Sequence, residues 1–169
     1  MRRERSKTHE AAAVGRRDRQ QTGSEGDAYG LRGKLPDPTA CPRCHAIYRA
    51  GRWTWGSPPA DAHQTECPAC RRTADRVPAG IVTVKGEFAA AHREEIRNLL
   101  RHVEEREKAE HALKRIMAIE EGDEGALTVS TTDAKLARAL GEALHSAYRG
   151  DLDYQFVESE SCFRATWTR

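Results

Sequence analysis

The chain has 169 residues, of which 38% are hydrophobic, 6% aromatic and 32% charged. Its 28 basic side chains nearly balance 26 acidic ones, and the net charge of +2 does not indicate a nucleic-acid partner. The apolar runs are far too short for a transmembrane helix, and no apolar segment follows the basic start at Met1–Arg5 as a secretory signal would require. We therefore expect a cytoplasmic protein with no membrane partner.

Residues 1–38 have the composition of a disordered tail. The first 19 residues hold seven basic and three acidic side chains, and the segment has no apolar periodicity. Basic arms of this kind often contact nucleic acid, although a solubilising extension fits equally well. Leu35–Pro38 then predicts a stiff linker.

Four of the five cysteines form two Cys-Pro-x-Cys pairs, which indicates a metal site. Cys41 and Cys44 are separated from Cys67 and Cys70 by 22 residues. A two-residue spacer folds into a tight turn that directs both sulfurs toward one ion, and two such turns complete the tetrahedral shell of structural zinc. We predict a zinc ribbon over residues 39–78, with one structural Zn²⁺ held by these four cysteines.

Other uses of the same cysteines stay open. Two disulfides, or a redox pair, would share the spacing, but a reducing cytosol disfavours disulfides. Four thiolates already fill the shell, so we do not expect His45 or His63 to be ligands. The fifth cysteine, Cys162, is interpreted as a small buried side chain.

The ribbon is locally basic, with six arginines against three acids over residues 41–76. Arginine pairs with phosphate and stacks on bases, and exposed aromatic rings stack on unpaired bases. The candidate RNA-binding residues are Arg43, Arg49, Arg52, Trp53, Arg71 and Arg72. The alternative for Trp53 and Trp55 is that one or both belong to the core.

Residues 79–169 follow the order β-α-β-β-α-β with one extra strand. The expected strands are 81–84, 115–119, 127–129, 152–157 and 163–167, and the expected helices are 87–111 and 133–148. Thr132 or Asp133 would cap the second helix, and Gly150 would end it. We therefore predict the α+β class, with a ferredoxin-like split βαβ domain whose two helices cover one sheet face.

No catalytic motif stands out in the sequence. There is no Walker A motif, nucleophile elbow or HExxH pair, so we do not expect an enzyme. The Glu-rich run Glu104–Glu107 would suit a basic protein partner, although its mixed charges also fit a solvated helix face.

These residues together resemble a known family. The two knuckles, the segment Thr131–Arg138 and the strand pair after it are similar to the large-ribosomal-subunit export adaptor family, in its zinc-binding part and following α/β domain. The run Val103–Glu110 brings the chain closer to a group of short bacterial relatives of unknown role. Adaptors of the family carry more than one set of knuckles and a further domain, so the resemblance does not extend to nuclear export.

The resemblance implies binding to ribosomal RNA or the large ribosomal subunit. Our leading hypothesis is a non-enzymatic zinc protein with that partner. The rival hypothesis is a protein-interaction adaptor that uses the Glu-rich helix and the sheet, with a purely structural ribbon. A regulatory redox role for the thiols is a third hypothesis.

Overall fold

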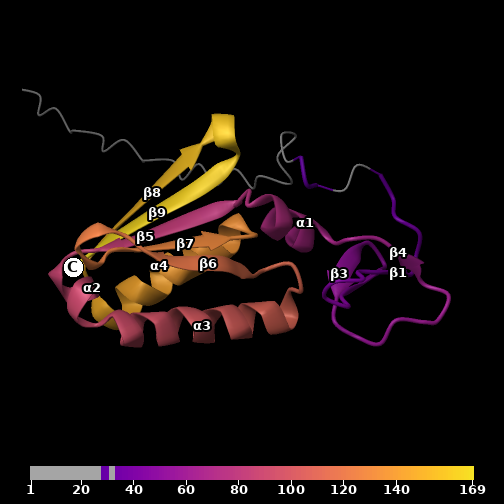
Figure 1. Cartoon of the computed structure of the whole chain (residues 1–169), viewed down its shortest axis with the longest axis horizontal. Helices are drawn as coiled ribbons and strands as arrows, with labels where there is room; N and C mark the ends of the chain where they lie inside the picture. Colours follow the sequence, from indigo (N-terminus) through magenta and orange to yellow (C-terminus); the bar gives the residue numbers. More distant parts are fainter. Residues whose placement is uncertain (1–27, 31–32) are drawn as a thin grey trace, which may run out of the picture.

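We describe the chain from a computed structural model, which covers residues 28–30 and 33–169. It is a mixed α+β structure with two separate sheets, as the sequence predicts (Figure 1). Most of the predicted tail over residues 1–38 lies outside the described residues. No helix in the described part of the chain is long and apolar enough to cross a membrane.

The ribbon contains a small sheet followed by a helix. Its elements are β1 (Thr39–Ala40), β2 (Ile47–Arg49), β3 (Arg52–Thr54), β4 (His63–Gln64) and α1 (Pro68–Asp75). The strand order is β3-β2-β1-β4, and only the β1–β4 pair is parallel. The helix α1 was not predicted. It begins there because the Cys67 sulfur caps the N–H of Cys70 and Pro68 occupies the first turn, a position that suits proline.

The second sheet carries two long helices. Its elements are β5 (Gly80–Lys85), α2 (Glu87–Ala91), α3 (Arg93–Glu110), β6 (Ile116–Glu121), β7 (Leu127–Thr131), α4 (Ala134–Tyr148), β8 (Asp151–Val157) and β9 (Cys162–Thr168). Short 3-10 turns at Asp123–Gly125 and Glu158–Glu160 close the two hairpins. The order of strands and helices along the chain is the predicted one.

The predicted helix over 87–111 is broken at His92, which has φ −115° and ψ 29°. The break separates α2, whose Phe88 ring packs against Tyr148 and Trp167 at one end of the core, from α3. On α3 the side chains of Ile96 and Leu100 are fully buried. Side chains on both sides of the break thus contribute to the core.

The sheet differs from a ferredoxin-like sheet at one position. Its strand order is β6-β7-β5-β9-β8, so β9 lies beside β5, and the two are parallel. In the ferredoxin-like arrangement the strand that directly follows α4 would take that place. Burial explains the difference: β9 buries Ala165 and Trp167, whereas β8 is largely exposed and begins with Asp151 and Asp153. The apolar strand therefore lies inside the sheet and the polar one at its edge.

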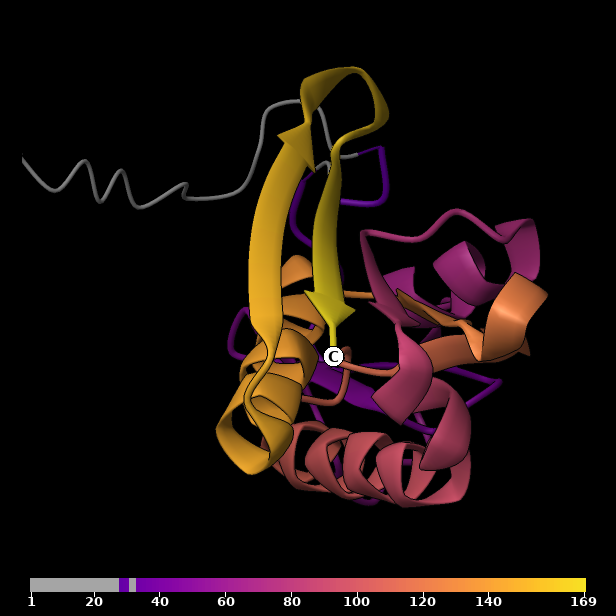
Figure 2. The ribbon, with the colours of Figure 1, turned by 90° about the vertical axis from the view of Figure 1, so that its left-hand side faces the viewer.

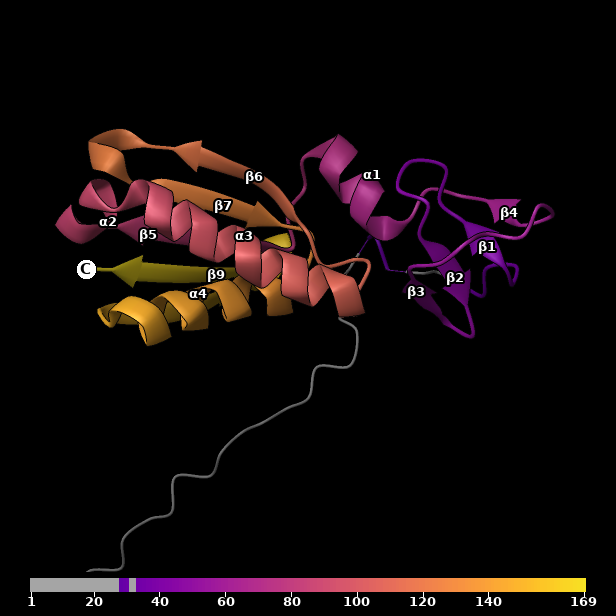
Figure 3. The ribbon, with the colours of Figure 1, turned by 90° about the horizontal axis from the view of Figure 1, so that it is seen from below.

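Both long helices pack on the same face of this sheet, as predicted (Figure 3). Asp133 caps α4 by accepting the N–H of Leu136 at 2.9 Å, and the stripe through Leu140 and Leu144 is fully buried. In the described part of the chain, Thr73 near the end of α1 and Arg76, which follows the helix, line a hollow on the opposite face. One broad sheet face is thus left without a helical cover.

Candidate metal centre

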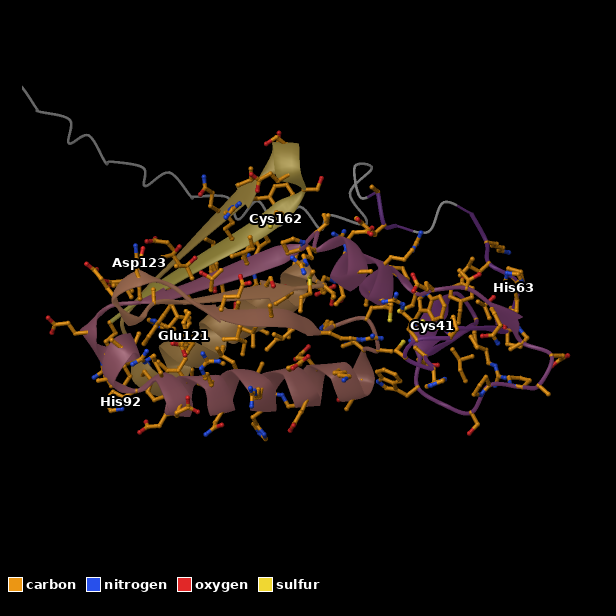
Figure 4. All side chains as sticks on the ribbon, in the orientation of Figure 1. Cys41, His63, His92, Glu121, Asp123 and Cys162 are labelled. Atoms are coloured by element: carbon orange, nitrogen blue, oxygen red, sulfur yellow. The ribbon has the colours of Figure 1, made fainter. Side chains whose placement is uncertain are left out.

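Four cysteine side chains from the two knuckles meet inside the ribbon. Their sulfur atoms all lie within 4.8 Å of one another. Cys41, Cys67 and Cys70 are buried, and Cys44 is partly buried. Figure 4 places Cys41 near the junction of the ribbon with the larger sheet. The geometry therefore brings together the predicted ligand set, and these sulfurs can hold one metal ion.

The two nearby histidines and the fifth cysteine, none of which we expected to be a ligand, lie outside this cluster. His45 and His63 are exposed and contribute no atom to it. Cys162 is 2% exposed on β9, away from Cys41 (Figure 4). Burial raises the pKa of the Cys162 thiol, which keeps it protonated, as expected for a packed cysteine.

Backbone hydrogen bonds shape each knuckle. The N–H of Cys41 donates to the carbonyl of Ala46 at 2.8 Å, and the left-handed φ of 62° at His45 turns the chain back after the first pair. In the second knuckle the N–H of Cys67 donates to the Cys41 sulfur at 3.3 Å, and the N–H of Cys70 donates to the Cys67 sulfur at 3.4 Å. Donors directed at sulfur favour its thiolate form.

The pKa of the Cys41 thiol differs in direction from those of Cys67 and Cys70. Burial acts against the thiolate of Cys41, but N–H groups of Cys67, Cys44 and Arg43 outweigh burial and lower its pKa to about 7. For Cys67 and Cys70 burial dominates and raises the pKa of both thiols. Ionising Cys67 and Cys70 together with Cys41 therefore needs an added positive charge, which a bound metal ion would supply.

Part of that positive charge comes from a residue that the sequence analysis missed. Arg115, just before β6, donates from Nη2 to the Cys44 sulfur at 3.1 Å and from Nη1 to the Cys70 sulfur at 3.4 Å. Burial opposes the charge of Arg115, but its contacts with the thiols prevail and raise its pKa. No spacing rule links a residue 45 positions after Cys70 to a knuckle, so no local signal could have found it.

The fold holds Arg115 firmly in place. Its backbone N–H donates to the Thr132 hydroxyl at 2.9 Å, and its Nε donates to the carbonyl of Ala112 at 2.9 Å. Its guanidinium group also lies 5.4 Å from the centre of the Trp55 ring, whose Nε1 donates to the carbonyl of Lys108 at 2.6 Å. Trp55 therefore connects the ribbon to the end of α3, and Arg115 connects β6 to the cysteines.

Three of the candidate RNA-binding arginines are exposed. Arg49 and Arg52 lie directly opposite each other across the β2–β3 hairpin. Arg43 is exposed as well and forms an ion pair with Glu66. The hairpin thus presents two guanidinium groups to solvent at its tip.

The other three candidates are less accessible. Trp53 is 6% exposed and packs against Tyr48, with ring centres 5.7 Å apart, so it belongs to the ribbon core. Arg72 is also 6% exposed, and its Nη1 donates to the carbonyl of Val77 at 3.2 Å. Arg71 is partly buried. With 6% of its surface exposed, the Trp53 ring offers little area on which a base could stack.

A groove of about 430 Å³ lies where the ribbon meets the start of α4. Its cationic lining comes from Arg52 on β3, from Lys114, and from the exposed Lys135 in the first turn of α4. Lys114 is bound to Glu107 at 2.6 Å, whereas Arg52 and Lys135 have no ion pair within the described residues. Folding therefore adds Lys135, which is 83 positions from Arg52, to the basic surface of the ribbon.

Comparisons with known proteins place no relative beside this chain. No protein-family model matches it, and no similar curated protein or solved structure was found.

Proposed function

We propose that this chain is a zinc protein in which the metal ion has a structural role. A tetrahedral Zn²⁺ site with Zn–S distances of about 2.3 Å places its sulfurs about 3.8 Å apart. The sulfurs of Cys44 and Cys67 are 3.7 Å apart, which matches that spacing. Four thiolates leave no position for water, so the ion would stabilise the fold and carry out no chemistry.

We further propose that the ribbon binds RNA through its basic surface, without an enzymatic activity. The observation that carries this proposal is the groove between β3 and α4, which Arg52 and Lys135 line together with Asp133, the two cations having no ion pair in the part of the chain that the structure describes. Arg49 extends the basic surface to the hairpin tip. Guanidinium and ammonium groups bind phosphate by charge, so such a surface would hold RNA without reading its sequence.

The partner that we propose is ribosomal RNA or the large ribosomal subunit in the cytoplasm. Support for this partner comes from the resemblance of the two knuckles and the segment Thr131–Arg138 to the ribosomal export adaptors. Within that segment Thr132 positions Arg115 beside the cysteines, and Lys135 lines the groove. The resembling segment thus contributes to both parts of the proposed site.

The test measures binding of the zinc-loaded full chain to ribosomal RNA over a range of salt concentrations. The triple variant Arg49→Ala, Arg52→Ala, Lys135→Ala should bind more weakly, and the slope of log affinity against log salt should fall by about 1 for each lost phosphate contact. The control variant Lys85→Ala, Arg101→Ala, Arg106→Ala removes the same charge from exposed positions outside the groove. Equal losses in both variants, or no binding at low salt, would overturn the proposal.

One observation supports the alternative hypothesis of a protein-interaction adaptor. The uncovered face of the larger sheet has a hollow of about 530 Å³ with Ile81, Met117 and Thr128 among its lining residues. Binding of a protein partner to this face should be unaffected by RNase treatment and by the groove variant. Binding to ribosomal RNA should be lost in both cases. Co-sedimentation with ribosomes, before and after RNase, distinguishes the two.

A further inference from the structure

The outer strand of the larger sheet carries two aromatic rings that the core leaves half exposed. Tyr154 is 42% exposed and Phe156 is 43% exposed, both on β8. The Tyr154 ring lies 5.4 Å from Phe163 on β9, and the Arg138 guanidinium lies 5.1 Å from the centre of the Tyr154 ring. These side chains form a fixed apolar surface beside the free edge of the strand.

Apart from the charges of Asp151 and Asp153, the β8 edge has few of the features that usually protect an edge strand. Within the described residues β8 pairs with β9 alone, in a regular register from Asp151 to Val157. The strand has no lysine, no proline and no bulge, whereas β6 at the opposite edge has a register irregularity between Ile116 and Ala118. A long, regular edge with unpaired backbone groups is a template for another strand. Figure 2 shows the turn end of the β8–β9 hairpin extending beyond the helices.

We propose that β8 pairs in an antiparallel manner with β8 of a second copy of this chain, centred on Tyr154. In this register Leu152 faces Phe156 of the other copy, Asp153 faces Gln155, and Asp151 faces Val157. Apolar side chains meet on the helix side of the sheet, and each acidic side chain meets an uncharged one on the opposite side. All seven residues of the strand are paired.

The charges favour this register over the two registers centred on Asp153 and on Leu152. A shift of the symmetry centre to Asp153 would place two aspartates directly opposite each other, and a shift to Leu152 would pair Asp151 with Asp153 twice. Like charges in directly opposite positions destabilise a strand pair. The Tyr154 register also brings Glu158, in the turn Glu158–Glu160 of one copy, near the exposed Arg149 of the other, whereas Glu160 pairs with Arg164 of its own copy at 2.6 Å. Because the two-fold axis repeats every contact, each favourable pair counts twice.

The experiment follows the association of the zinc-loaded, RNase-treated full chain by light scattering and analytical ultracentrifugation. The wild type should shift with concentration from the single-chain mass to twice that mass. Gln155→Lys places a lysine opposite Asp153 of the other copy and should tighten the dimer about two- to thirty-fold, whereas Gln155→Asp should weaken it by a similar factor. Both substitutions are at one exposed position, so each serves as the folding control for the other.

A third variant tests the centre of the interface. Tyr154→Lys brings two lysines together at the symmetry axis and should leave the chain a monomer over the concentrations at which the wild type is a dimer. A monomeric wild type at all concentrations would overturn the proposal. So would a dimer that Tyr154→Lys leaves intact, or Gln155 variants that change its stability in the same direction. None of these results depends on RNA binding.

Discussion

The guanidinium group of Arg115 lies 3.1 Å from the Cys44 sulfur, across 71 positions of sequence. A zinc ion with four thiolates carries two surplus negative charges, and a buried cation beside the sulfurs offsets part of them. Arg115 belongs to the segment that leads into β6, so the charge comes from outside the ribbon. Metal binding and the contact of the ribbon with the larger sheet are therefore coupled through one side chain.

Substitution of Arg115 should weaken metal binding. Arg115→Met removes the donors to the sulfurs while keeping much of the side-chain volume, and loss of such an outer-shell partner typically costs about 10–100-fold in metal affinity. Competition with a zinc chelator measures the change. Arg101→Met on the exposed side of α3 is the matched control and should behave like the wild type. Equal zinc affinity for both variants would show that Arg115 has no role at the metal.

The cysteines should act as one unit. Cys41→Ser with Cys44→Ser should abolish zinc binding and unfold the ribbon, because metal binding supplies about 10–16 kcal/mol in small zinc modules. Elemental analysis and circular dichroism measure the two effects. Cys162→Ser, at a buried cysteine outside the cluster, should keep one zinc per chain. Full zinc content in the double variant would contradict the proposed site.

The two ribbon tryptophans should differ in their effect on stability. Trp53→Ala removes a ring that is 6% exposed and should cost about 3–5 kcal/mol in the free energy of unfolding. Trp55→Phe keeps a ring beside Arg115 but loses the hydrogen bond to Lys108, which should cost about 1 kcal/mol. Urea unfolding of the zinc-loaded chain measures both changes. A larger loss for Trp55→Phe would contradict the assignment of Trp53 to the core.

Close packing of α4 on β5 depends on Gly80. A Cβ atom at this position would lie 2.5 Å from Cβ of Ala137 and 2.8 Å from the Thr131 hydroxyl oxygen. Gly80→Ala should therefore destabilise the chain by about 1–3 kcal/mol in urea unfolding. Adding Ala137→Gly should recover part of the loss by removing the nearer contact. Gly122→Ala meets nothing closer than 3.8 Å and serves as the control.

The Glu107–Lys114 pair should make a pH-dependent contribution to stability. The hydrogen bond from Lys114, 2.6 Å away, lowers the pKa of the Glu107 carboxyl group. A carboxylate whose pKa is lowered on folding stabilises the fold above its unfolded pKa of about 4.3, and this contribution is lost as the pH falls through the lowered value. NMR titration of the Glu107 carboxyl carbon measures the shift. Lys114→Met should move the midpoint upward, and an unchanged midpoint would contradict the pairing.

The cysteine cluster could be read from the sequence because short-range geometry specifies it. In a Cys-Pro-x-Cys turn two sulfurs converge within four residues, so their partnership needs no knowledge of the rest of the chain. The order of the strands and helices was equally readable, because the apolar periodicity of α4 and the turn at Asp123–Gly125 are local patterns. The capping of α4 by Asp133 is also a local pattern that the sequence shows directly.

The positions of several side chains and strands in the folded protein depend on contacts between residues that are far apart in the sequence. The sequence did not separate Trp53, which packs against Tyr48, from Trp55, which binds the carbonyl of Lys108. β9 lies inside the sheet because it buries Trp167, whereas the polar strand β8 lies at the edge. The order of the two strands along the chain does not show which of them takes the inner position. A two-residue spacing thus identified the cysteines. The positive charge beside their sulfurs comes from Arg115, and only the packing of the larger sheet against the ribbon brings that residue within hydrogen-bonding distance.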